Sequence, residues 1–381
     1  MRDGFRVIDA DRHILEPSDL FDRYLAARFR GRVRIEGPNQ SGRFVDDELI
    51  SDSQRLPRQV TGEASEDFGV IFAGSKRWRE VFADALAAGF DPASNVRDMD
   101  REGVDLGVLF PTLGLYIMWR DNVDPELSAA ICRAYNTWLA EYCNFDEKRL
   151  RGVALIPLQD PARAVSELRH AREQLGLVGI FWRPNVLCGR TLASPDYFPI
   201  YEAASDLGIP LCIHEGARTV LPQAGADRYS EFGRHVACHP LEQMLACLNL
   251  CADGVLERFP RLRVAHLESG CGWVPFWLER MDEHWEHESH GAARTTREKP
   301  SFYFTRQCWT SCEAGEALVS SYVEHVDSDS LMVATDYPHV DAIDKFPELT
   351  VGALSANKTL TDETRGKILW TNPARFYGLK I

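Results

Sequence analysis

Short polar clusters stand where apolar runs of this chain end, and their side chains could do metal chemistry. The first cluster is Asp9-Ala10-Asp11-Arg12-His13, which follows the apolar run 5–8. On a strand, residues two apart face the same side, so Asp11 and His13 are expected to project together. A carboxylate beside an imidazole is half of a site for a divalent metal ion. A surface turn with an incidental Asp/His pair is the alternative.

Three further clusters help to decide between these interpretations, because each also ends an apolar run. They are His214-Glu215-Gly216, His266-Leu267-Glu268-Ser269 and Asp336-Tyr337-Pro338-His339. A single histidine at a strand end is more often a buried structural residue than a ligand. Four such ends that meet at one rim of a barrel favour a metal site.

The elements that must position these clusters alternate between strands and helices. Apolar runs that predict strands lie at 5–8, 106–110, 152–156, 178–182, 210–214, 262–266, 302–305 and 331–336. Alternation implies a parallel sheet, and eight units predict a closed (β/α)8 barrel of the TIM type. An open doubly wound sheet is the alternative, but no G-x-G-x-x-G or G-K-[ST] loop follows a strand.

One stretch does not fit the alternation. Residues 28–75 are rich in Gly, Ser, Asp and Arg and show no clear helical or strand periodicity. Long excursions of this kind are usually functional or mobile. We therefore expect a single domain over residues 1–381, with 28–75 as an insertion or lid between the first and second barrel strands.

Composition excludes several classes of function. Lys and Arg number 43 and Asp and Glu 57, which gives a formal net charge of −14. Such an acidic chain is not expected to bind nucleic acid or anionic membranes. The absence of a signal-peptide pattern and of long apolar runs predicts a cytoplasmic protein. The 10 cysteines include no C-x-x-C pair and are expected to be buried, reduced thiols.

Taken together, the clusters resemble motifs of the amidohydrolase superfamily, in particular the group of aminocarboxymuconate semialdehyde and γ-resorcylate decarboxylases. The residues that carry the likeness are 9–13 with Glu16-Pro17, 212–215, 265–270 and 334–339. The likeness extends from Val7 to Leu379 and excludes only the insertion before Lys76. The resemblance implies one divalent metal ion (Zn, Fe or Mn). It implies four ligands, which are Asp11, His13, His214 and Asp336.

The same resemblance implies that His266 is the general acid/base. No lysine ends the fourth strand, so the carboxylated-lysine bridge of binuclear members is expected to be absent. Arg12 should point away from the metal by strand alternation. Glu268 could face the site as well, either binding a second metal or, as we favour, supporting a ligand.

Other residues at the predicted rim could bind an anionic substrate. Cations and aromatic rings at a barrel mouth suit a carboxylate or a coenzyme phosphate, although salt bridges at the rim are an equal alternative for the cations. The candidates for substrate contact are Tyr116, Trp182, Arg183, Arg218, Glu268 and His339.

These residues predict a metal-dependent enzyme acting on a small carboxylate or acyl compound. Our first choice is hydrolysis of a thioester, ester, lactone or amide, with a metal-activated water, Asp336 orienting that water and His266 as acid. The alternative is non-oxidative decarboxylation of an aromatic or enoic acid. A non-catalytic partner subunit is a second alternative, but it predicts missing ligands and none is missing. A homodimer is expected.

Overall fold

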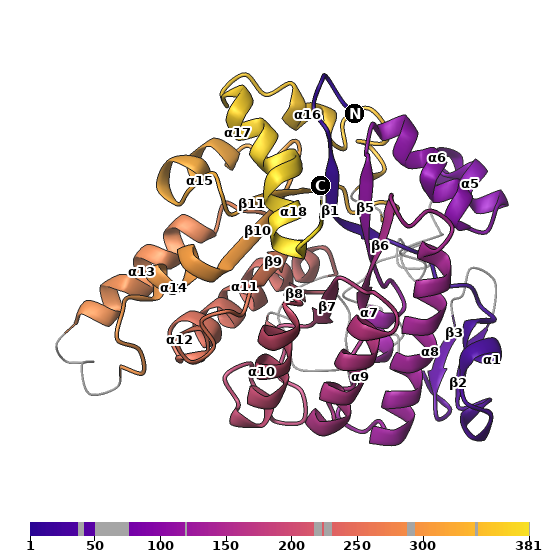
Figure 1. The fold of residues 1–381 in the computed structure, drawn as a ribbon. Coiled ribbons are helices and arrows are strands. Elements are labelled where there is room, and N and C mark those ends of the chain that lie inside the picture. Colours follow the sequence, from indigo (N-terminus) through magenta and orange to yellow (C-terminus); the bar gives the residue numbers. More distant parts are fainter. Residues whose placement is uncertain are drawn as a thin grey trace.

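Eight parallel strands form one sheet in the computed structural model, which describes residues 1–36, 42–49, 76–118, 120–216, 223–224, 231–287, 294–339 and 342–380. Their order is β1-β5-β6-β7-β8-β9-β10-β11. The sheet closes on itself where β1 meets β11, because the amide of His13 donates to Tyr337 O at 2.6 Å and that of Asp336 to Asp11 O at 3.2 Å. The predicted (β/α)8 barrel is confirmed, with helices surrounding the strands (Figure 1).

The strands and helices of the barrel follow the predicted alternation closely. The barrel strands are β1 Ile8–His13, β5 Leu106–Phe110, β6 Leu150–Ala154, β7 Gly179–Trp182, β8 Leu211–His214, β9 Val264–Leu267, β10 Cys308–Glu313 and β11 Leu331–Ala334. The helices are α1 Leu20–Tyr24, η1 Ala27–Phe29, α4 Lys76–Val81, α5 Ala83–Ala87, α6 Pro92–Glu102, α7 Gly114–Ile117, α8 Pro125–Cys143, α9 Pro161–Glu173, η4 Pro195–Tyr197, α10 Phe198–Leu207, α11 Glu231–Cys251, α12 Val255–Arg258, α13 Val274–Glu286, α14 Pro300–Gln307, α15 Val319–His325, α16 Gly352–Ser355, α17 Asp362–Gly366, η7 Lys367–Thr371 and α18 Asn372–Tyr377.

Two strand predictions were wrong in position. The aromatic run 302–305 lies in helix α14, and the seventh barrel strand is β10, which follows it. Strand β1 begins at Ile8 rather than Phe5 and extends to His13, so the first polar cluster forms the strand instead of following it. All six residues of β1 are buried, including the charged ones.

The predicted insertion contains a small second sheet. Strands β2 Val33–Glu36, β3 Gly42–Val45 and β4 Glu48–Leu49 pair antiparallel in the order β2-β3-β4. An ion pair from Arg32 Nη1 to Asp124 Oδ2 at 3.1 Å ties this sheet to the start of α8, beside which it lies (Figure 1). Residues 37–41 and 50–75 of the insertion lie outside the described part of the chain, and a role as a lid stays a prediction.

A buried charge network fastens β1 to helix α6. Arg12 points away from the barrel interior, as predicted, and its Nη1 lies 2.6 Å from Glu102 Oε2. Its Nε donates to Asn95 Oδ1 at 2.8 Å, and its guanidinium lies 3.7 Å from the centroid of the Tyr337 ring. Because Arg12 and Glu102 are fully buried, each charge depends on the other for compensation.

The cysteines are unpaired thiols. Nine of the 10 are buried, and Cys188 is partly exposed in the loop after β7. Among the described residues, no helix combines the length and apolar character needed to cross a bilayer.

Candidate metal centre

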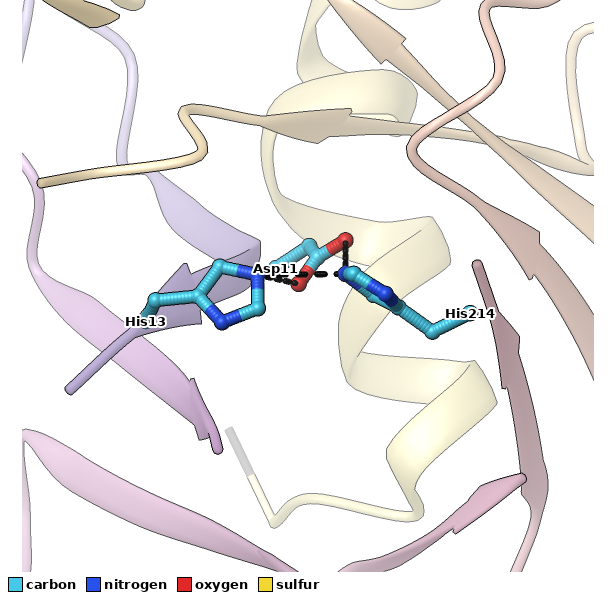
Figure 2. A group of neighbouring side chains, drawn as sticks. All are labelled: Asp11, His13 and His214. Atoms are coloured by element: carbon cyan, nitrogen blue, oxygen red, sulfur yellow. Dashed lines mark hydrogen bonds and ion pairs between the residues drawn. The ribbon is translucent and has the colours of Figure 1, made fainter. Parts of the chain in front are cut away.

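Three of the predicted ligands converge at the mouth of the barrel (Figure 2). The Nε2 atoms of His13 and His214 lie 3.1 Å apart. The carboxylate of Asp11 reaches both rings, with Oδ1 at 3.6 Å from His13 Nε2 and Oδ2 at 3.3 Å from His214 Nε2. Asp11 and His13 come from the end of β1 and His214 from the end of β8, so strands far apart in the sequence build one group of donors.

The fourth predicted ligand joins the same group from the loop directly after β11. Asp336 Oδ1 lies 3.5 Å from His13 Nε2 and 2.7 Å from His339 Nδ1. The ring of His339 stacks on His13, with centroids 3.9 Å apart, and its Nε2 lies 2.9 Å from Thr112 Oγ1. Asp336 has a left-handed backbone, with φ of 54°. Such a conformation is costly for a residue other than glycine and is often retained at functional sites.

The hydrogen bonds of the two histidines fix which nitrogen faces the centre. His13 Nδ1 lies 2.9 Å from Pro111 O, and His214 Nδ1 lies 2.6 Å from Glu215 O. A carbonyl only accepts, so each Nδ1 carries the hydrogen and each Nε2 of a neutral ring presents a lone pair. Metal-binding histidines characteristically place their second nitrogen on such an acceptor.

The donor group fits a divalent cation. Lone pairs and carboxylate oxygens that converge without a hydrogen between them repel each other unless a positive charge joins them. The separations of 3.1–3.6 Å match the distance of about 3.0–3.5 Å between neighbouring ligand atoms when metal–ligand bonds are about 2.1 Å long. Within the described residues, buried Asp11 Oδ1 has no hydrogen-bond partner, which is consistent with a ligand atom.

Burial and neighbouring charges shift the pKa values of the group. Burial raises the pKa of Asp11 and lowers that of His13 well below its usual range. Burial also opposes protonation of His214, but the carboxylates of Asp11 and Glu268 outweigh it and raise that pKa. The group therefore holds His13 neutral, as a metal ligand must be.

Glu268 lies in the site rather than behind it. Its Oε2 is 3.1 Å from His214 Nε2 and its Oε1 is 3.4 Å from Nε2 of His239, a residue of α11. We favoured a role in supporting a ligand, but Glu268 approaches the ligand atom of His214 directly. Its backbone is also left-handed, with φ of 50°.

The prediction that His266 is the acid/base of the site is contradicted by its position. In the parallel pairing of β8 with β9, His214 lies opposite Leu267, whereas His266 lies opposite Ile213. Since paired residues face the same side, His266 points to the outer, helical layer. There its Nδ1 lies 2.8 Å from Gln243 Oε1 and its ring faces Phe304.

Two predicted substrate residues also point elsewhere. Trp182 lies opposite Ile213 and packs on Tyr197 and Tyr201 outside the barrel. The guanidinium of Arg183 is fully buried and bonds Glu215, the carbonyl of Leu115 at 2.8 Å and Asn185 at 3.0 Å. Arg183 therefore joins the loops after β5, β7 and β8, and its donors are committed to the protein.

The structure places one of the remaining substrate candidates in the site and leaves the other two untested. His339 lies in the site, against Asp336 and His13. Tyr116 is buried in α7, and its contact with substrate stays a prediction. Arg218 lies outside the described residues.

Sequence reasoning assigned no role to Gln243, which links two of the strands that carry the site. Gln243 bonds His266 and also donates to Ile213 O at 2.7 Å and Leu267 O at 3.1 Å, which links β8 to β9. Gln243 recurs with His235 and His239 every four residues along α11, and this spacing is the signal that could have identified Gln243, because it places all three on one helix face.

Comparisons with known proteins agree with the fold. A relative from Dictyostelium discoideum, a 2-amino-3-carboxymuconate-6-semialdehyde decarboxylase, is 26% identical over 308 residues, which cover 80% of each chain. A gamma-resorcylate decarboxylase from Polaromonas sp. is 24% identical over 333 residues, covering 81% of this chain and 93% of its own.

A solved structure shares the fold. It is a dihydroxybenzoic acid decarboxylase from Polaromonas sp. with bound manganese and an inhibitor, which matches with a TM-score of 0.66 at 18% identity over 98% of this chain and 97% of its own. A profile of the amidohydrolase family matches residues 8–379. That match spans almost the whole sequence, and the chain belongs to the amidohydrolase family.

Proposed function

We propose that this chain is a non-oxidative decarboxylase of small aromatic carboxylic acids that works at one divalent metal ion. The observation that carries the proposal is the complete group of four donors at the barrel mouth, from Asp11, His13, His214 and Asp336, in a chain whose relatives are decarboxylases. The manganese in the dihydroxybenzoic acid decarboxylase supports Mn²⁺ as the ion, with Zn²⁺ and Fe²⁺ as alternatives.

The four donors would hold the cation, which would supply Lewis-acid polarisation of the substrate carboxylate. The protein supplies the apolar walls. The rings of Phe110 and Phe181 lie 5.5 and 5.8 Å from the ring of His214, centroid to centroid. Such surroundings exclude water from an aromatic ring and favour loss of a charged carboxylate as neutral CO₂.

The proton that replaces the carboxylate needs a donor in the site. Since His266 faces the outer layer, we assign this step to Asp336, with His339 as its positioning residue. Asp336 takes up a proton from solvent and delivers it to the ring carbon as the bond to the carboxylate breaks and CO₂ leaves. The neutral ring of His339, whose Nδ1 lies 2.7 Å from Asp336 Oδ1, holds the carboxylate in place. Thr112, which contacts His339 Nε2, orients the imidazole.

Hydrolysis, the first choice from sequence, is less well supported. It relied on His266 as the acid for the leaving group, and the relatives are decarboxylases. A homodimer remains a prediction of the sequence.

The test is a product assay on protein loaded with Mn²⁺. We expect CO₂ release from one or more hydroxybenzoates and, in D₂O, one deuterium at the vacated ring carbon. His13→Ala, which removes a metal ligand, should show neither. A parallel panel of acyl thioesters and lactones tests hydrolysis, and release of thiol or acid without CO₂ would overturn the proposal. Inactivity on both panels with metal bound would favour the partner-subunit alternative.

A further inference from the structure

A second group of donors lies beside the four-donor group and has no place in the proposed reaction. One ligand atom from each of His235, His239 and Glu268 lies within 4.8 Å of the other two. Glu268 connects the two groups, because its Oε1 is 3.4 Å from His239 Nε2 and its Oε2 is 3.1 Å from His214 Nε2.

Local structure explains why these side chains meet. His235 and His239 are four residues apart in α11, so both lie on one face of that helix, and their ring centroids are 4.6 Å apart. Glu268 follows directly after β9 with a φ of 50°. The left-handed conformation ends the strand and leaves the carboxylate between the helix and the end of β8.

The orientation of His239 leaves a nitrogen for a positive charge. Its Nδ1 lies 3.1 Å from His235 O, a carbonyl that only accepts. The hydrogen of a neutral ring is therefore on Nδ1, and the lone pair of Nε2 faces the carboxylate of Glu268. A lone pair and a carboxylate oxygen in contact need a proton or a cation between them.

We propose that His235, His239 and Glu268 form a second site for a divalent transition-metal ion, with Glu268 bridging it to the first. Two imidazoles and one carboxylate are donors that Mn²⁺, Fe²⁺ and Zn²⁺ accept. Separations of up to 4.8 Å exceed those in a closed coordination shell, so the ion would draw the three side chains together. The inference does not depend on decarboxylation, only on the donors.

The experiment measures the number of metal ions bound per chain. Apoprotein of the full chain is saturated with Mn²⁺, freed of loosely held ion by gel filtration and analysed by plasma mass spectrometry. We expect two Mn²⁺ per chain in the wild type and one in His239→Ala and in His235→Ala. The matched control is His325→Ala, an exposed histidine of α15, which should keep two.

Electron paramagnetic resonance supplies a second readout. Two Mn²⁺ ions bridged by one carboxylate are spin-coupled, so the wild type should lack the hyperfine pattern of isolated Mn²⁺ that each histidine variant should show. A wild type that saturates at one Mn²⁺ overturns the inference and leaves a proton between His239 and Glu268. A His239→Ala variant that still binds two ions also overturns it.

The outcome is separable from that for the proposed function. CO₂ release with one bound Mn²⁺ would remove the second site alone. Two bound Mn²⁺ with no CO₂ release from any hydroxybenzoate would remove decarboxylation alone. If His239→Ala does not fold, His239→Gln and His235→Ala test the same donors.

Discussion

At the residue scale, His339 connects a candidate ligand to the loop after β5. Its Nδ1 contacts Asp336, its Nε2 contacts Thr112 and its ring stacks on His13. Burial lowers the pKa of His339 to about 3, so the free ring is neutral near pH 7. A neutral ring can contact the Asp336 carboxylate without competing with a cation for it.

We expect His339→Ala to lower kcat on an aromatic acid about 10²- to 10⁴-fold, because it removes the ring that holds Asp336, the proposed proton donor, in place. Bound Mn²⁺ should stay near the wild-type amount, since His339 is not among the four proposed ligands. Steady-state kinetics with metal analysis on the same samples measures both, and His325→Ala serves as the control. Unchanged kcat would exclude a role of His339 in positioning Asp336.

His266 should behave in the opposite way. The variant His266→Phe is expected to keep kcat within a few-fold of wild type but to lower the free energy of unfolding by about 1–3 kcal/mol, because Gln243 Oε1 loses its buried donor. Urea denaturation and a parallel activity assay measure the two effects. Loss of activity with unchanged stability would mean that His266 acts in the reaction after all.

The residue types of the site could be predicted from sequence, but the direction of each side chain could not. A barrel strand is buried on both faces, so an apolar run such as 262–266 has no alternation of polar and apolar residues to show which side chains face the barrel interior. The pairing with β8 shows that Leu267 rather than His266 faces inward. The left-handed backbone at Glu268 then brings a carboxylate into the site. Asp11 and His13 could be predicted to face the same side, because residues two apart on a strand do so whichever side that is.

At the element scale, the contact between β1 and α6 depends on one buried ion pair. The Arg12 guanidinium and the Glu102 carboxylate are both inaccessible to water, and Arg12 Nη1 also lies 3.4 Å from Asp9 Oδ2. The strand that carries two proposed ligands is therefore held by charges on its outer face.

Glu102→Ala should lower the free energy of unfolding by about 3–5 kcal/mol, because it leaves the Arg12 charge buried without its closest partner. The control on the same helix is Asp100→Ala, which breaks an exposed pair with Arg149 and should cost at most about 1 kcal/mol. Chemical denaturation of both variants gives the comparison. Similar small losses would show that Asp9 alone compensates Arg12.

The seventh barrel strand shows why the type of one element can be predicted wrongly although the fold is predicted correctly. The aromatic run 302–305 has the composition of a strand, yet its buried neighbours Pro300, Tyr303, Phe304 and Gln307 have helical spacing, and Pro300 begins the helix. Strand propensity depends on context, and here packing of one helix face overrides it. The true strand, β10, contains Thr310, Ser311 and Glu313 and lacks a continuous apolar run.

At the scale of the whole molecule, the barrel brings donors from β1, β8 and β11 together only when it is folded. A cation bound there stabilises the folded state and not the unfolded chain, by about 2.7 kcal/mol when free metal is about 100 times its Kd. The order of elements was sufficient to predict this closed architecture, because alternation over eight units leaves few other topologies.

Removal of metal with a chelator should therefore abolish activity and lower Tm by a few degrees, and added Mn²⁺ should restore both. Differential scanning calorimetry of the apo and loaded protein measures the shift. His13→Ala is the control, because it should show a low Tm that Mn²⁺ raises less than it raises that of the wild type. An equal response of wild type and variant to Mn²⁺ would place the ion elsewhere.

The distribution of buried and exposed thiols allows one cysteine to be labelled selectively. Since only Cys188 of the 10 cysteines is partly exposed, a native sample should react rapidly with Ellman's reagent at one position and at all 10 after denaturation. Partial burial and then Asp121 raise the pKa of Cys188, so the native reaction should need mildly alkaline solution. A fluorophore attached to Cys188 would lie in the loop after β7. This loop contacts the loop after β5, because the Cys188 amide donates to Asp121. The fluorophore would therefore report the entry of ligands at the barrel mouth between these two loops.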